Sequence, residues 1–134
     1  MRVKDQREKT NPNIKKIKVL IAEDNESNYT LYEHMLTGNY ELIHAWNGEE
    51  AVELFEQTHP DIILMDISMP KMDGYEATNE IKRKDALVPI IAVTAYAFAT
   101  DKERMLESGF NGYVSKPINH TRLKEEIADV LKKH

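Results

Sequence analysis

Residues 60–70 read PDIILMDISMP, and the rest of the chain is organised around this stretch. Its centre, residues 62–65, is an unbroken apolar run, too short for a helix and typical of a strand buried on both faces. The run ends on Asp66, and Pro70 stops any continuation. Such a strand implies a parallel sheet between helices, with reactive groups beyond the carboxyl ends of the strands. Asp66 is therefore a candidate functional residue, although a lone strand-end Asp can equally begin a turn.

The remaining chain alternates between short apolar strands and amphipathic helices. Strands are expected at residues 17–22, 40–46, 62–65, 90–93 and 112–115. Helices are expected after the cap residues Asn25, Asn47, Asp73, Thr100 and Asn119. Strict alternation predicts an α/β fold of the doubly wound, flavodoxin-like type, because each parallel crossover needs a helix. The expected sheet has five parallel strands in the order 2-1-3-4-5, with five helices.

Composition narrows the function classes. The 134 residues fit one domain, and the absence of cysteine excludes a disulfide framework, a thiolate zinc site and a thiol nucleophile. No apolar run approaches the roughly 18 residues of a membrane span or forms a secretory signal. The chain is therefore expected to be soluble and cytoplasmic, without membrane contact by this domain.

The net charge of −5 is unevenly distributed. Residues 1–18 hold seven basic and two acidic side chains, a balance of +5, so the remainder carries −10. An acidic body repels nucleic acid, so no nucleic-acid binding by this domain is expected. Residues 1–15 are interpreted as a basic linker or tail, and residues 16–134 as the folded domain.

Chemically active side chains end four of the five expected strands. Glu23 and Asp24 follow the first, Asp66 the third, Thr94 the fourth and Lys116 the fifth. In the order 2-1-3-4-5 these ends are neighbours. Three carboxylates about 5 Å apart would repel by roughly 3 kcal/mol per pair, so they would hold protons or bind a cation. Mg²⁺ suits such oxygen ligands and also binds phosphate, which predicts phosphoryl transfer onto the Asp66 carboxylate.

The chain resembles the receiver domains of two-component response regulators over residues 17–132. The resemblance rests on EDN at 23–25, LMDISMPKMDG at 64–74, VTA at 93–95 and YVSKP at 113–117. It implies that Asp66 is the phosphoacceptor and Lys116 its cationic partner. It also implies a Mg²⁺ site at Asp24, Asp66 and the main-chain carbonyl of Ser68, with Glu23 binding the ion through water. The acidic pair is Glu-Asp rather than the family's Asp-Asp.

The resemblance further implies a conformational switch and a docking face. Thr94 would move to bond the phosphoryl group while Tyr113 turns inward, and the bond before Pro117 would be cis. The expected partner is a histidine kinase or a histidine phosphotransfer protein, and homodimerisation on phosphorylation stays open. The residues expected to dock the bundle carrying the donor histidine are Ser27, Asn28, Leu31, Pro117 and Ile118.

Several alternatives remain open at this point. A magnesium-dependent phosphatase of the haloacid dehalogenase type also uses a strand-end Asp, but Ser68 stands where its general acid would be. A flavodoxin-like FMN carrier shares the strand order, but Glu23 and Asp24 would repel the phosphate. The preferred interpretation is a signalling domain that hydrolyses its own acyl phosphate rather than an enzyme.

The kind of receiver is a separate question. The segments 21–28 and 72–77 resemble receivers of hybrid sensor histidine kinases more than chemotaxis receivers. In that case residues 1–15 would be the tether to the kinase, and the domain would belong to the cytoplasmic portion of a membrane sensor. A stand-alone receiver is the alternative. All five histidines are expected to be surface residues, because no ligand spacing relates them.

Overall fold

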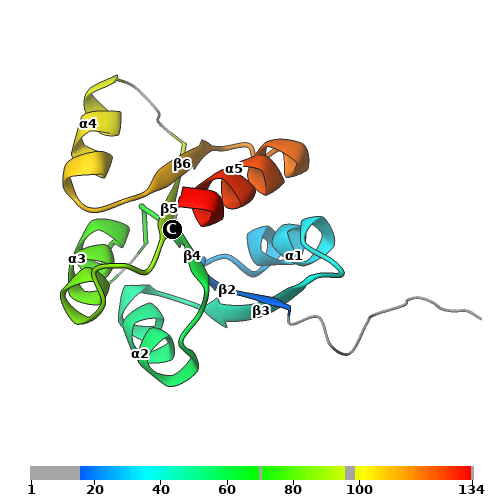
Figure 1. The fold of residues 1–134 in the computed structure, drawn as a ribbon, viewed down its shortest axis with the longest axis horizontal. Coiled ribbons are helices and arrows are strands. Elements are labelled where there is room, and N and C mark those ends of the chain that lie inside the picture. Colours follow the sequence, from blue (N-terminus) through cyan, green and yellow to red (C-terminus); the bar gives the residue numbers. More distant parts are fainter. Residues whose placement is uncertain (1–15, 70, 96–98, 134) are drawn as a thin grey trace, which may run out of the picture.

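The fold is a parallel sheet between two layers of helices, as the alternating sequence predicts. The computed structural model describes residues 16–69, 71–95 and 99–133 (Figure 1). Its strands are β2 (Ile17–Ala22), β3 (Tyr40–Ala45), β4 (Ile62–Asp66), β5 (Ile90–Thr94) and β6 (Gly112–Ser115). Its helices are α1 (Glu26–Met35), α2 (Gly48–Thr58), α3 (Gly74–Lys84), α4 (Ala99–Glu107) and α5 (His120–Lys133).

The five strands form one parallel sheet in the order β3-β2-β4-β5-β6. Numbered along the chain this is 2-1-3-4-5, so the predicted topology is confirmed. The central strand β4 pairs with β2 on one side, where Ala22 lies opposite Met65. It pairs with β5 on the other, where Asp66 lies opposite Val93. The carboxyl ends of β2, β4 and β5 are thereby neighbours.

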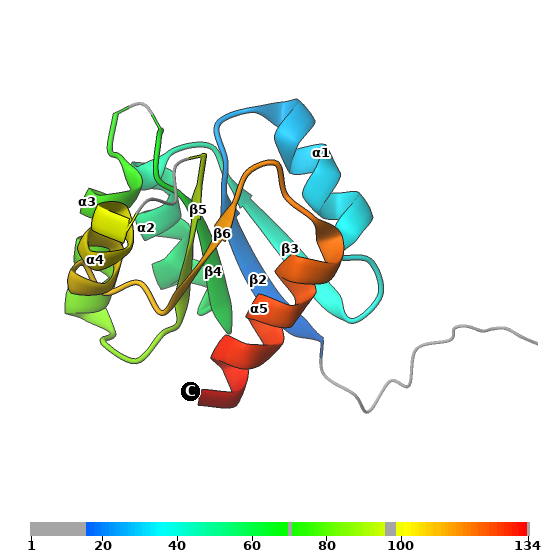
Figure 2. The same cartoon turned by 90° about the horizontal axis from the view of Figure 1, so that it is seen from above.

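Each face of the sheet packs against its own helices. One core combines alternate strand residues such as Leu20 and Ile63 with side chains of α2, α3 and α4. The other combines Val19 and Leu64 with side chains of α1 and α5. Figure 2 shows the two layers, with α1 and α5 on one side of the sheet. Residues 62–66 are all buried, which explains their unbroken apolar run.

Helix caps lie where the sequence predicts them at four positions. The side chains of Asn25, Asn47 and Asp73 accept hydrogen bonds from the first turns of α1, α2 and α3. Asn119 accepts one from Arg122 in α5. These caps begin four helices close to the strand ends. Helix α4 begins at Ala99, so the expected cap residue Thr100 lies inside the helix rather than before it. The predicted division at residue 15 falls outside the described residues. Within the described ranges, no helix is both long and apolar enough to span a bilayer.

Candidate functional site

Asp66 lies at the carboxyl end of β4, where the central strand leaves the sheet. It is buried, with 3% of its surface exposed, and both oxygens of its carboxylate accept hydrogen bonds. Oδ1 accepts a hydrogen bond from the main-chain N–H of Ser68 at 3.0 Å. Oδ2 accepts one from Nζ of Lys116, also at 3.0 Å. The predicted pairing of Asp66 with Lys116 is therefore present, fifty residues apart in sequence.

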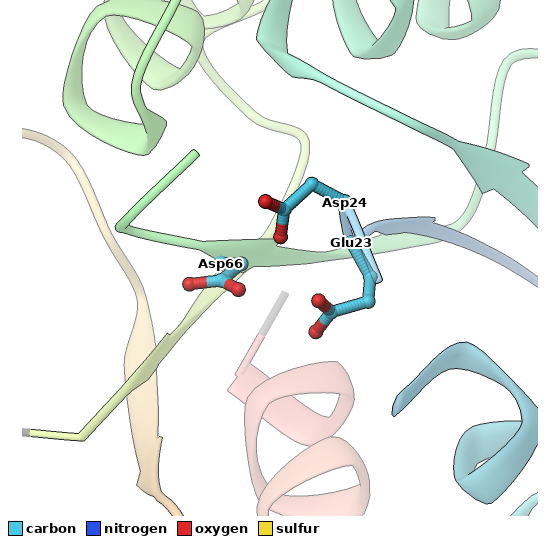
Figure 3. A group of neighbouring side chains, drawn as sticks. All are labelled: Glu23, Asp24 and Asp66. Carbon is cyan, nitrogen blue, oxygen red and sulfur yellow. The ribbon is translucent and has the colours of Figure 1, made fainter. Parts of the chain in front are cut away.

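Three carboxylates converge beside the end of β4. Each of Glu23, Asp24 and Asp66 offers an oxygen, and these oxygens lie within 4.8 Å of one another. Figure 3 shows the three side chains directed into one space, two from the end of β2 and one from β4. At this separation each ionised pair repels by about 3 kcal/mol at an effective dielectric constant near 20. The single ammonium group of Lys116 cannot offset three negative charges.

Glu23 is the most constrained of the three acidic residues. It is only 1% exposed, and its Oε2 accepts hydrogen bonds from the Asn25 N–H at 3.2 Å and the Asn28 side-chain amide at 3.4 Å. Its Oε1 is buried without a hydrogen-bond partner. Burial and then repulsion from Asp66 raise the pKa of Glu23 from 4.5 to about 6, against the opposing attraction of Lys116. The metal-free site therefore holds Glu23 in an unfavourable charged state at neutral pH.

These residues fit a hard divalent cation. The donor set is all oxygen, it is over-supplied with negative charge, and one buried carboxylate oxygen lacks a partner. A bound Mg²⁺ would lower the repulsion among the carboxylates, and a water molecule on the ion would give that oxygen of Glu23 a hydrogen-bond donor. Ser68 is exposed and lies two residues after Asp66, and its main-chain carbonyl is expected to be a further Mg²⁺ ligand. An acidic cluster is thus present in this chain at the place that the sequence predicts.

A glycine in the loop after β4 keeps the backbone close to Asp66. The Gly74 N–H donates to the carbonyl of Ile67 at 3.0 Å. A Cβ atom at Gly74 would lie 2.6 Å from the main-chain oxygen of Asp66 and 2.8 Å from Cα of Ile67. Real Cβ atoms do not approach backbone so closely, so only glycine allows this loop to fold back over the strand end. The glycine of the MDG segment (residues 72–74) therefore allows the loop to pack against the backbone of Asp66.

Strands β5 and β6 contribute the remaining predicted residues. Thr94 is 8% exposed at the end of β5, and its carbonyl accepts the N–H of Lys116 at 2.8 Å. Tyr113, half-buried in β6, has its N–H bonded to Glu126 of α5 at 3.0 Å. The Lys116–Pro117 peptide bond is cis, as the resemblance implies. Thr94 therefore ends the strand that pairs with β4, and Lys116, which follows β6, reaches Asp66 through its side chain.

A groove of about 400 Å³ lies between α1 and the loop after β6. Its lining residues are Glu23, Asn28, Leu31, Tyr32, Met35, Lys116, Pro117 and Ile118. It contains four of the five residues expected to dock a partner. The fifth, Ser27, is exposed on α1 but is not among the lining residues. Leu31 is 53% exposed, a large apolar surface at the rim of the acidic cluster. The groove therefore leads from an apolar helix face directly to Glu23 and Lys116.

The structure also reveals contacts that the sequence does not announce. Asn28, expected only at the docking face, holds the carboxylate of Glu23. Tyr32 lies in the groove, and burial followed by the charges of Glu23 and Asp66 raises its pKa, so its hydroxyl stays protonated. The expectation that every histidine is a surface residue is wrong for His44. This residue is half-buried and its Nε2 lies 2.8 Å from the Glu23 carbonyl.

Comparison with known proteins agrees with this geometry. The response regulator receiver domain family matches residues 19–128. The polar-differentiation response regulator DivK of Brucella anthropi is 43% identical over 116 residues, which cover 84% of this chain and 94% of that protein.

Two solved structures show the same likeness. The receiver domain of a sensor histidine kinase of Pseudomonas aeruginosa, with a magnesium ion coordinated in its active-site cleft, is 37% identical with a TM-score of 0.77. The alignment covers 88% of this chain and 96% of that domain. The chemotaxis protein CheY4 of Vibrio cholerae is 27% identical with a TM-score of 0.82, over 86% of this chain and 98% of that protein.

The family match covers most of the chain and includes all three converging carboxylates, Thr94 and Lys116. It confirms the predicted resemblance and gives no support to the haloacid dehalogenase alternative. This chain belongs to the response regulator receiver domains, the phosphoacceptor domains of two-component signalling.

Proposed function

We propose that Asp66 is the residue that accepts the phosphoryl group, and that Glu23, Asp24, Asp66 and the Ser68 carbonyl hold the Mg²⁺ ion it requires. The observation that carries this proposal is the convergence of three carboxylates and one ammonium group at neighbouring strand ends. A structural role alone does not explain why the fold brings like charges together. Bound Mg²⁺ would supply positive charge for the oxygens of the incoming phosphoryl group.

Asp66, Lys116 and Thr94 each have a separate role in the proposed phosphoryl transfer. An Asp66 carboxylate oxygen forms the bond to phosphorus as the bond between phosphorus and the donor imidazole nitrogen breaks, and that nitrogen keeps the electron pair. Lys116, which holds Oδ2 of Asp66 before transfer, is placed to pair with a phosphoryl oxygen afterwards. Thr94 supplies a hydroxyl from the adjacent strand. Attack of water on the phosphorus would later break its bond to the Asp66 oxygen, releasing phosphate and restoring the carboxylate.

The switch is proposed to run through β5 and β6. A phosphorylated Asp66 would draw the Thr94 hydroxyl toward the new dianion, and Tyr113 would turn toward the space that Thr94 leaves. Tyr113 already packs at the edge of the core formed with α2, α3 and α4. Phosphorylation would thereby change the surface near α4 and β6, which is where self-association would be expected.

The groove between α1 and the loop after β6 is the proposed docking place for a histidine kinase or a histidine phosphotransfer protein. It offers the exposed Leu31 and Pro117 beside Asn28 and Ile118, and it opens on the acidic cluster. A helical bundle seated there would bring its histidine close to Asp66. The relatives include the response regulator DivK and the receiver domain of a sensor histidine kinase. The similarities therefore agree both with a stand-alone receiver and with a receiver that is part of a hybrid kinase. The cytoplasmic location, the lack of nucleic-acid and membrane contact, and the tail at residues 1–15 remain predictions.

Labelling with a small phosphodonor tests the assignment. Wild-type protein incubated with acetyl phosphate and Mg²⁺ should gain one phosphoryl group, and Asp66→Asn should gain none. Asp129→Asn, at an exposed position of α5, is the matched control and should label like the wild type. Normal labelling of Asp66→Asn would show that another residue is the acceptor.

A further inference from the structure

His44 lies beside the point where β2 leaves the sheet. The backbone pairing of β2 with β3 ends at Ala22 and Ala45. Just beyond it, the Glu23 N–H still donates to the Ala45 carbonyl at 2.9 Å. The Glu23 carbonyl is within hydrogen-bond distance of a side chain: Nε2 of His44 lies 2.8 Å from its oxygen. A carbonyl oxygen only accepts hydrogen bonds, so Nε2 carries the proton in this contact.

Two aromatic rings hold the imidazole of His44 in place. Tyr29 of α1 stacks on one face, with ring centroids 3.8 Å apart and planes 3° from parallel. Trp46 contacts the ring at a centroid distance of 4.1 Å and an angle of 38°. A ring packed in this way has little freedom to turn away from the Glu23 carbonyl. Through these contacts the His44 side chain links α1, β3 and the end of β2.

The consequence reaches the acidic cluster through the backbone. The Glu23 carbonyl belongs to the peptide group that links Glu23 to Asp24, and this group is planar and rigid. Fixing the carbonyl therefore fixes the direction in which the chain enters Asp24. Both residues place a carboxylate oxygen in the cluster, against mutual repulsion. Without an anchor, this repulsion can be relieved by turning the peptide group and moving Asp24 outward, toward solvent.

We propose that His44 is a positioning residue for the Mg²⁺ site, acting through its hydrogen bond to the carbonyl of Glu23. The inference rests on the proposed function, because it requires that Glu23 and Asp24 bind the ion. His44 touches neither the ion nor the phosphoryl group. It holds the acidic pair in the arrangement that the ion needs, as partners behind metal ligands do in other metal sites.

Two substitutions separate the hydrogen bond from the packing. His44→Phe keeps a ring between Tyr29 and Trp46 and removes the donor. His44→Gln removes the ring and keeps an amide N–H that can reach the position of Nε2. The exposed His34 at the end of α1 offers a control, His34→Phe. For each protein, the Mg²⁺ dissociation constant is measured by calorimetry in the same buffer at one fixed pH. The melting temperature is measured alongside.

We expect His44→Phe to weaken Mg²⁺ binding about tenfold, as loss of an outer partner does elsewhere, while its melting temperature stays near the wild-type value. His44→Gln should lose stability but bind Mg²⁺ nearly as tightly as the wild type. Wild-type affinity in His44→Phe, or affinity that follows melting temperature across the variants, would overturn the inference. Asp24→Asn is measured in parallel. If the wild type bound no Mg²⁺, or Asp24→Asn bound it normally, the proposed function itself would fail.

Discussion

Neutralising Glu23 should stabilise the metal-free protein, although the substitution alters a candidate functional residue. Glu23 is buried beside Asp66, and its pKa rises from 4.5 to about 6 on folding. The folded state therefore binds this proton more tightly than the unfolded state does. The stabilisation from Glu23 is fully present below pH 4.5 and is lost as the pH rises through about 6. This rise in the pKa of Glu23 corresponds to a destabilisation of about 2 kcal/mol at neutral pH.

Glu23→Gln removes the charge and keeps an acceptor for the Asn25 N–H and the Asn28 amide. Its new amide hydrogens can point toward the carboxylates of Asp24 and Asp66. We expect the free energy of unfolding of Glu23→Gln to match the wild type near pH 4.5. Above about pH 7 it should exceed the wild type by about 2 kcal/mol.

Urea unfolding in EDTA, followed across this pH range, measures the difference. At pH 7.5 the midpoint should move up by about 1 M urea with an unchanged slope. Glu53→Gln, at an exposed position of α2, controls for the loss of one acidic charge and should leave the pH profile unchanged. Added Mg²⁺ should stabilise the wild type more than Glu23→Gln. A variant that is less stable than the wild type at pH 7.5, or a difference that does not vary with pH, would refute the reasoning.

Two further substitutions test the backbone that supports the site. Gly74→Ala forces a methyl group against the carbonyl of Asp66, so we expect a loss of about 1–3 kcal/mol in urea unfolding, and unchanged stability would contradict the close approach. Glu126→Ala removes the acceptor of the Tyr113 N–H, so the exchange of that amide hydrogen with solvent, measured by NMR, should become roughly tenfold faster. Glu125→Ala, at the exposed neighbouring position, is the control and should leave the exchange rate unchanged.

The fold was predictable because its strands carry strong and consistent signals. Residues 62–66 and 90–94 are buried on both faces, so they are continuous apolar runs with a polar residue at the end. The caps at Asn47 and Asp73 mark where helices begin. Since parallel strands present their carboxyl ends at one edge, listing the residues that end each strand was enough to assemble Asp66, Lys116 and the acidic pair.

Contacts that depend on side-chain direction were not predictable in the same way. His44 lies in a strand of mixed polarity, and nothing in its neighbours along the chain indicates that its ring reaches the Glu23 carbonyl. That contact exists because β2 and β3 are adjacent and because Tyr29 and Trp46 hold the ring. The second contact of Asn28, to the carboxylate of Glu23, likewise depends on how α1 follows β2.

The most direct test of the central claim is to identify the residue that carries the phosphoryl group. Protein treated with acetyl phosphate and Mg²⁺ is reduced with borohydride, which converts an aspartyl phosphate to homoserine, and its peptides are sequenced by mass spectrometry. The account predicts homoserine at position 66 alone, and none when EDTA replaces Mg²⁺. Homoserine at Asp24 or elsewhere, or equal modification in EDTA, would contradict it.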